Sequence, residues 1–143
     1  MRRFLTILAV GLTLSACESA VSNDQGEGRL AQNDWIAETI AGRPVINPAR
    51  VTLAFLEGRV SGRSGCNLYS GPVEIGPGTL KIGALISTKM ACMQEGVMQQ
   101  ESAYLSALQS AQTYSIGGDK LTITTPTGSI VYGATARQAQ PGE

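Results

Sequence analysis

The side chains of this chain that are best suited to chemistry are three cysteines, because histidine is absent from the sequence. Without an imidazole base, neither a Ser-His-Asp triad nor a Cys-His pair can form. Zinc sites with histidine ligands are excluded for the same reason. Five acidic residues lie between Glu38 and Glu101 inclusive, and none forms a recognisable carboxylate pair for glycoside hydrolysis. The sequence therefore predicts a protein that is not an enzyme and that holds no cofactor or metal.

The first cysteine, Cys17, ends a segment with the features of an export signal. Two arginines precede an apolar run over residues 4–14, and Leu14-Ser15-Ala16-Cys17 follows. A basic start, a short apolar run and small residues at the cleavage point are typical of a secretory signal peptide. The run is shorter than the ~20 apolar residues of a membrane helix. Residues 14–17 are similar to a bacterial lipobox, so we expect a signal peptide over residues 1–16 and a lipid on Cys17.

Two other interpretations of this segment stay open. One is an ordinary secreted protein whose cysteine lies near the cleavage point by chance, and the other is a twin-arginine signal at Arg2-Arg3-Phe4-Leu5 with atypical flanking residues. Glu18 follows the expected lipid attachment point, where the Gram-negative sorting rule uses aspartate to retain a lipoprotein at the inner membrane. If the host has two membranes, glutamate predicts an outer-membrane lipoprotein facing the periplasm.

The expected mature chain, residues 17–143, has the length of one domain and a nearly balanced charge. Loss of Arg2 and Arg3 leaves nine basic residues against eleven acidic ones. Such a balance supplies neither a basic footprint for nucleic acid nor a polybasic stretch for lipid headgroups. We therefore expect no binding to nucleic acid, and contact with the membrane only through the lipid on Cys17. We also expect a monomer, with an envelope protein as a possible partner.

Polarity and apolar spacing divide the mature chain into segments. Residues 17–33 are small and polar, which predicts a flexible tether, and the tail 135–143 is predicted to be frayed. Residues 94–111 lack proline and have apolar residues at helical spacing, which predicts one helix. Alternating runs bounded by turn residues predict strands over 35–40, 51–55, 59–63, 72–75, 79–82, 113–116, 120–125 and 129–132.

Many short strands and one helix in about 100 residues predict a mainly β (α+β) fold. We expect either a small twisted antiparallel sheet or a partly open β-barrel, with the α-helix packed on it. Gly62, Gly65 and Gly71 stand where such a sheet bends sharply or where two backbones approach closely.

Cys66 and Cys92 are the two thiols that remain if Cys17 carries a lipid. An even pair in an oxidising compartment favours a disulfide, which in the chain-entropy model contributes about 3.5 kcal/mol for this loop length. The alternative of two separate, buried, reduced cysteines stays open.

Two blocks around these cysteines carry a family resemblance: Gly65-Cys66-Asn67-Leu68-Tyr69-Ser70-Gly71 and Ser87-Thr88-Lys89-Met90-Ala91-Cys92. Together they resemble the two signature blocks of the META domain, the family that includes the HslJ-like bacterial lipoproteins. With weaker matches on either side, the resemblance covers residues 34–134. It implies a small antiparallel β domain with one helix, exported or lipid-anchored, associated with envelope stress and antibiotic tolerance. It supplies no catalytic residues. The candidate motif residues are Gly65, Asn67, Tyr69, Gly71, Thr88, Lys89, Met90 and Glu101.

Three of these residues have both a structural and a binding interpretation. Asn67 is expected to make a local side-chain to backbone hydrogen bond, with ligand recognition as the alternative. Tyr69 is expected to pack its ring at the sheet edge, with stacking on a sugar or base as the alternative. Glu101 falls on the apolar face of the predicted helix, where an unpaired carboxylate is costly. We expect it to pair with Lys89, or else with Arg59 or Arg63, with a binding site as the alternative.

Three methionines, Met90, Met93 and Met98, lie near the start of the predicted helix. Methionine fills irregular gaps in a core, which is the expected role, and it also forms adaptable contact surfaces.

Three functions follow as hypotheses. The first is a non-enzymatic, membrane-anchored envelope protein with a binding or stabilising role in envelope stress or antibiotic tolerance. The second is an inhibitor of a periplasmic or host enzyme, a lysozyme or protease, that binds through loops 42–50 and 117–120. The third is a carrier of a small apolar ligand inside a hollow barrel, although about 100 residues with few aromatics favour a filled core.

Overall fold

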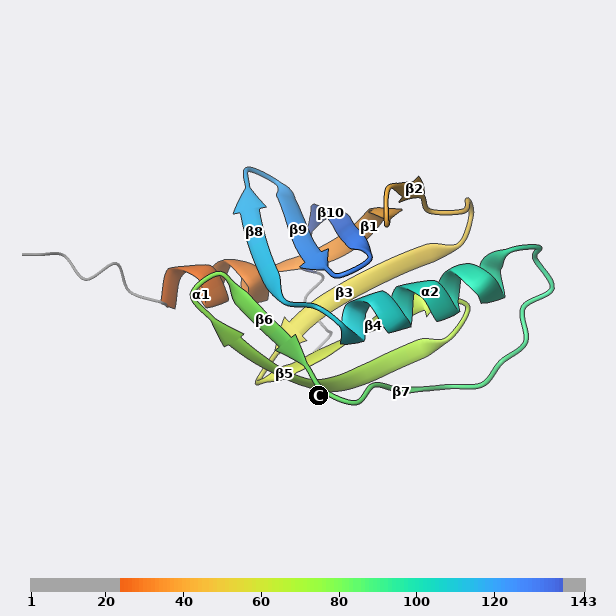
Figure 1. Ribbon diagram of the computed structural model, residues 1–143, viewed down its shortest axis with the longest axis horizontal. Helices are drawn as coiled ribbons and strands as arrows, with labels where there is room; N and C mark the ends of the chain where they lie inside the picture. The colour runs from red at the N-terminus through yellow and green to blue at the C-terminus, as the bar shows by residue number, and fades with distance from the viewer. Residues whose placement is uncertain (1–23, 138–143) are drawn as a thin grey trace, which may run out of the picture.

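The computed structural model describes residues 24–137, so the predicted signal peptide, Cys17 and residues 138–143 lie outside the described part. Within it the chain forms a closed antiparallel β-barrel with two helices (Figure 1). None of the helices in residues 24–137 is long and apolar enough to cross a membrane. The elements in chain order are α1 (Asp24–Gln32), β1 (Asn33–Ile40), β2 (Arg43–Pro44), β3 (Arg50–Leu56), β4 (Arg59–Gly65), β5 (Leu68–Gly76), β6 (Thr79–Ile82), β7 (Ile86–Ser87), α2 (Val97–Gln109), β8 (Thr113–Gly117), β9 (Lys120–Thr125) and β10 (Gly128–Ala136).

Eight of the strands form the barrel wall, in the order β1-β3-β4-β5-β6-β8-β9-β10, and β10 pairs back onto β1. That closing pairing runs from Asn33↔Ala136 to Ile40↔Ile130. The weakest junction lies between β6 and β8, which share one residue pair, Thr79↔Thr113. The predicted mainly β class and every predicted strand are therefore confirmed, and the barrel is closed rather than partly open.

The hairpin turns explain how so many short strands pair with their neighbours. At the β3–β4 turn, Glu57 and Gly58 both have positive φ, 49° and 72°. Two consecutive residues with positive φ match the right-handed twist of the flanking strands, which favours a two-residue hairpin. The turns at 76–78, 117–119 and 126–128, rich in glycine, also lie between paired strands.

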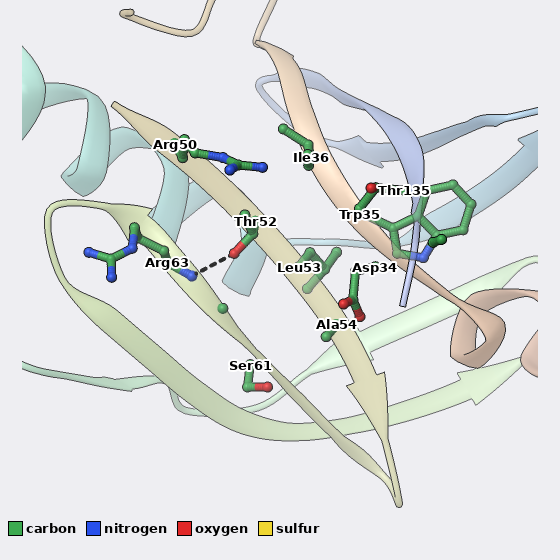
Figure 2. A pocket seen from close by; sticks show the side chains of 12 residues that line it. Asp34, Trp35, Ile36, Arg50, Thr52, Leu53, Ala54, Ser61, Arg63 and Thr135 are labelled. Atoms are coloured by element: carbon green, nitrogen blue, oxygen red, sulfur yellow. Dashed lines mark hydrogen bonds between the residues drawn. The ribbon is translucent and has the colours of Figure 1, made fainter. Parts of the chain in front are cut away.

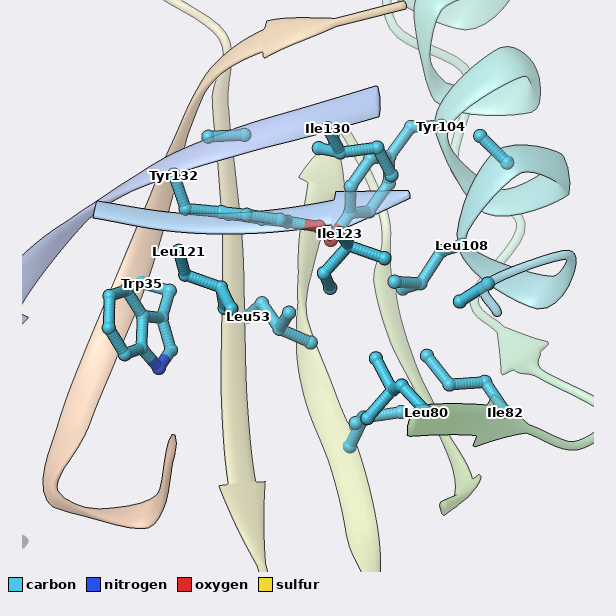
Figure 3. Close-up of a cluster of buried hydrophobic side chains, with 14 of the residues drawn as sticks. Trp35, Leu53, Leu80, Ile82, Tyr104, Leu108, Leu121, Ile123, Ile130 and Tyr132 are labelled. Atoms are coloured by element: carbon cyan, nitrogen blue, oxygen red, sulfur yellow. Dashed lines mark hydrogen bonds between the residues drawn. The ribbon is translucent and has the colours of Figure 1, made fainter. Parts of the chain in front are cut away.

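The interior of the barrel is filled by side chains from all sides of the wall and from both helices. Figure 3 shows Trp35, Tyr132 and the aliphatic residues of β9 and β10 pointing inward, where they meet Tyr104 and Leu108 of α2. Apolar residues alternate along the strands, so one face of each strand supplies this core. A filled interior gives no support to the hypothesis of a carrier for an apolar ligand.

The prediction of a flexible tether over residues 17–33 was wrong for residues 24–32, because these residues form α1. Gly26 and Gly28 disfavour a helix, but tertiary contacts compensate. Leu30 is completely buried in the core, and the Trp35 indole N–H donates a hydrogen bond of 3.1 Å to the Leu30 carbonyl. The helix is stabilised by this packing rather than by its own sequence.

The start of the predicted frayed tail is also ordered. Thr135 and Ala136 belong to β10 and pair with Asp34 and Asn33. Arg137 follows, and its guanidinium contacts Asp34 and donates to the Phe55 carbonyl at 2.9 Å. Pairing with the first strand fixes this segment, because closing the barrel requires it.

The two helices lie at opposite ends of the barrel (Figure 1). Since the strands alternate in direction, the turns at 57–58, 76–78 and 117–119 lie at one end, which we call the α1 end. Arg29 of α1 donates to the Gly118 carbonyl there. The connections 65–67 and 88–96 lie at the other end, beside α2, which we call the α2 end. The predicted helix 94–111 is confirmed as α2, with slightly shorter bounds.

Candidate functional site

The two signature blocks meet at the α2 end, where a disulfide joins Cys66 to Cys92 as predicted. Cys66 lies in the connection between β4 and β5, and Cys92 lies in the segment that leads into α2. The bond spans 26 residues of sequence. It therefore holds the long connection before α2 against the barrel wall.

Glu101 of α2 lies at the centre of this end and is 6% exposed. Its Oε2 accepts hydrogen bonds from the Ser64 hydroxyl at 2.7 Å, the Asn67 backbone N–H at 2.8 Å and the Cys66 backbone N–H at 3.3 Å. Its Oε1 accepts one from the Asn67 side-chain amide at 2.6 Å. One buried carboxylate thus organises the whole β4–β5 connection.

The predicted ion pair of Glu101 was wrong, because neutral donors surround its carboxylate instead. In the described part of the chain, no salt bridge joins Glu101 to Lys89, Arg59 or Arg63. Burial by itself would raise the pKa of Glu101, but the hydrogen bonds from Asn67, Ser64 and Cys66 outweigh it and lower the pKa. The carboxylate is therefore stabilised in its charged form without a cation.

Asn67 connects the two signature blocks through its side chain. Its Oδ1 accepts from the Met90 backbone N–H at 2.7 Å and the Thr88 hydroxyl at 2.8 Å. Its Nδ2 donates to the Met90 carbonyl at 3.2 Å as well as to Glu101. The prediction of a local hydrogen bond was wrong, since the backbone partner lies 23 residues away. Four bonds use the full capacity of the amide, which favours a structural role over ligand recognition.

Tyr69 is buried in the core rather than packed at the sheet edge. Its hydroxyl donates to the Thr52 carbonyl at 2.8 Å and lies 2.7 Å from the Tyr104 hydroxyl. The Tyr132 hydroxyl in turn donates to Tyr104 at 3.2 Å. We call Tyr69, Tyr104 and Tyr132 the tyrosine chain. Burial, with the effect of neighbouring tyrosines, raises the pKa of all three phenols well above the ordinary value.

The glycines of the first signature block have the predicted steric roles. Gly65 has a φ of +121°, a conformation that disfavours other residues. A Cβ at Gly71 would lie 2.7 Å from the Leu85 side chain and 2.9 Å from the Ala84 carbonyl, so β5 and the connection after β6 approach too closely for any side chain.

The three methionines near α2 are exposed, so the prediction that they fill the core was wrong. Met93 is 97% exposed, Met90 53% and Met98 38%. Met90 and Met98, together with Lys89 and Leu105, line a shallow cavity of about 350 Å³ between the second signature block and α2. We call these three exposed side chains at the α2 end the methionine face. Met90 and Met98 lie directly outside the network around Glu101, and Met93 lines a neighbouring hollow with Arg63 and Val97.

A second hollow lies on the outer wall of the barrel and has a volume of about 360 Å³ (Figure 2). Strands β1, β3 and β4 line it, with the end of β10 at one side. We call it the outer groove. Its polar side chains are Asp34, Arg50, Thr52, Ser61, Arg63 and Thr135.

The sequence profile of the META domain matches residues 28–138. The chain belongs to the META domain family. The match begins within α1, which shows that part of the helix missed by the sequence analysis belongs to the META domain.

Solved structures share the fold of this META domain. An NMR structure of a protein from Burkholderia xenovorans is 23% identical, covers 96% of this chain and 100% of its own, and has a TM-score of 0.63. A second NMR structure is 24% identical, covers 75% and 92%, and has the same TM-score of 0.63. A crystal structure of a DUF4847 family protein from Bacteroides vulgatus is 15% identical, covers 79% and 99%, and has a TM-score of 0.52. These likenesses show the fold alone. A search of curated proteins finds no match.

The chemistry available at the α2 end of the META domain is structural. The Glu101 oxygens are taken up by four donors, and both cysteines are in the disulfide. Within residues 24–137, no three His, Cys, Asp or Glu side chains are grouped so as to hold a metal ion. Lys89 is exposed and lines the cavity beside the methionine face.

Sequence reasoning missed several residues that complete these sites. Ser64 comes three residues before Asn67 and is buried, but a lone serine in a strand gives no signal. Tyr104 and Tyr132 were predictable as inward residues from their spacing, although their hydroxyl contacts were not. Arg50 and Ser61 share the outer groove only because β3 and β4 are neighbours in the wall.

Proposed function

We propose that this META-domain protein is a lipid-anchored protein of the bacterial envelope that acts by binding an envelope protein rather than by catalysis. The observation that carries the proposal is the separation of the two barrel ends. The chain enters the domain through α1 at one end, and both signature blocks lie at the other.

The length of chain before α1 determines how an anchor on Cys17 would place the domain. Since α1 begins at Asp24, six residues, 18–23, separate Cys17 from it. Fully extended, six residues span roughly 20 Å. A lipid on Cys17 therefore keeps the α1 end near the membrane and directs the α2 end into the periplasm.

The methionine face is the surface that this orientation makes available. Its three thioether side chains are flexible and polarisable, so they adapt to an apolar partner surface. The network of Glu101 and Asn67 and the disulfide hold the backbone beneath these side chains fixed. A rigid support loses little conformational entropy on binding. We therefore expect the partner to present an apolar segment.

The hypothesis of an enzyme inhibitor is restricted by the same geometry. Loop 42–50 lies at the α2 end, and loop 117–120 lies at the α1 end. The two loops therefore do not form one continuous surface. An inhibitor that binds through the α2 end would use loop 42–50. Inhibition assays against a panel of lysozymes and proteases test this alternative.

The anchor is tested by labelling cells with radioactive palmitate. We expect label on the wild-type protein, its recovery with the outer membrane, and loss of both in Cys17→Ser. Glu18→Asp serves as a matched variant, which should keep the label and move the protein to the inner membrane. An unlabelled wild-type protein free in the periplasm would contradict the anchor.

A further inference from the structure

We propose that the outer groove binds a small anion with a carboxylate or phosphate group. This site is separate from the methionine face and does not depend on a lipid anchor. The groove has a volume of about 360 Å³, enough for a small molecule, and its opening is created by the strands themselves (Figure 2).

The groove exists because the barrel wall is loosely paired at this point. Strands β1 and β3 pair at two positions only, Trp35↔Leu53 and Ile36↔Thr52. The ladder between β3 and β4 is paired at Val51↔Ser64 and again at Ala54↔Ser61, and the residues between do not bridge. The register is the same on both sides of this interval, so no residue is inserted. The backbone pairing is instead irregular over this interval.

Two hydrogen bonds to Thr52 take the place of the ladder bonds in this interval. The Thr52 carbonyl accepts a hydrogen bond from the Tyr69 hydroxyl. The Arg63 backbone N–H donates a hydrogen bond of 2.9 Å to the Thr52 hydroxyl oxygen. Gly62 permits this arrangement, because a Cβ there would lie 2.0 Å from the Thr52 carbonyl oxygen. The Ser61-Gly62 pair, which follows the β3–β4 hairpin, thus shapes the groove.

The polar groups that this arrangement leaves free are donors. The Thr52 hydroxyl accepts from Arg63, so its own hydrogen remains available. Within residues 24–137, the Ser61 hydroxyl and the Arg50 guanidinium have no hydrogen-bond partner. Figure 2 shows the Arg50 side chain extending across β3 toward Ile36, over the groove. The Thr52 hydroxyl and the Arg50 guanidinium match the acceptor oxygens of a carboxylate or phosphate. The Ser61 hydroxyl, beside Ala54, offers a further donor farther along the groove.

The charge of the groove also favours an anion. Its single carboxylate, Asp34, is paired with Arg137, with 3.2 Å between Nε and Oδ1. Arg50 and Arg63 have no carboxylate within 4.0 Å in the described part of the chain. The Arg63 guanidinium points away and donates to the Cys66 carbonyl at 3.3 Å, so Arg50 is the cation that faces the ligand. Ile36 and Ala54 add an apolar wall, which suits an anion with a short hydrocarbon part.

The test is an NMR titration of the expected mature chain, residues 17–143 with Cys17→Ser, with its disulfide intact. The ligands are inorganic phosphate, hexanoate and phosphatidylglycerol vesicles, and sodium chloride at matched ionic strength is the blank. We expect saturable shifts of the backbone amides at Thr52, Ser61, Gly62 and Arg63 with phosphate or hexanoate. The stronger of the two identifies the anion class.

Two matched variants make the result specific. Arg50→Gln removes a charge-assisted hydrogen bond and should weaken binding roughly tenfold. Arg59→Gln, on the same outer face but outside the groove, should leave binding unchanged. Equal weakening by both variants would show diffuse attraction and overturn the proposal. Shifts seen with vesicles only, or none beyond the chloride blank, would overturn it as well.

Discussion

At the scale of single residues, Glu101 determines the structure of the α2 end. Its carboxylate accepts four hydrogen bonds from three residues, two of them in the first signature block. Replacement by glutamine would turn an amide NH2 toward donors and leave some of them without an acceptor. An unsatisfied buried donor costs about 1–3 kcal/mol, and more where the lost acceptor was charged.

We therefore predict that Glu101→Gln lowers the free energy of unfolding by about 2–4 kcal/mol. Denaturant unfolding of the domain measures it, and Glu95→Gln, which changes an exposed carboxylate six residues earlier, is the control. The loss should depend on pH. The folded-state pKa of Glu101 is lowered, so its stabilising effect is complete above the unfolded-state pKa of about 4.3. It is lost as the pH falls through the folded-state pKa. Equal acid sensitivity in wild type and Glu101→Gln would contradict this role.

At the scale of elements, the tyrosine chain joins β10, α2 and β5 and ends on the Thr52 carbonyl of β3. Burial raises the pKa of all three phenols, so they remain protonated at pH values where an unfolded chain ionises. Their contribution is complete below a pH of about 10 and is lost as the pH rises through the folded-state values.

An alkaline titration followed by tyrosine absorbance tests this chain of hydroxyls. Tyr114 is partly exposed and should ionise first, although burial raises its pKa too. The other three should ionise only together with loss of the folded circular dichroism signal. Tyr114→Phe, as a matched control, should remove the first step alone. Reversible ionisation of all four residues in the folded protein would be inconsistent with the chain.

The individual helices and strands differ in how well they could be predicted from the sequence. Strand positions followed from alternation and from turn residues such as Glu57-Gly58, because hairpins are local. Helix α1 could not be predicted from its own residues. It is stabilised by the burial of Leu30 against barrel strands that come later in the sequence. The pairing of β10 with β1 is equally non-local. At the site, the family resemblance identified Asn67 and the helical spacing identified Glu101. Neither predicted their direct contact at 2.6 Å, which depends on how α2 crosses the wall.

At the scale of the whole molecule, the proposed function makes the barrel a spacer with two different ends. One end receives the chain through α1, and the other carries the disulfide, the buried network and the methionine face. The two signature blocks fix the backbone under Met90, through Asn67, and leave its side chain free to contact a partner. In this account, the family's motif residues are the support and the neighbouring exposed side chains are the contact.

The most direct test is site-specific photo-crosslinking in living cells, with the crosslinking amino acid at Met93 or, as the matched site at the α1 end, at Glu57. Both positions are exposed, so neither replacement should unfold the domain. We predict a discrete adduct with one envelope protein from position 93 and none from position 57. Adding Met90→Glu should remove the adduct without lowering stability. No adduct from position 93, or the same adducts from both ends, would contradict a working surface at the α2 end.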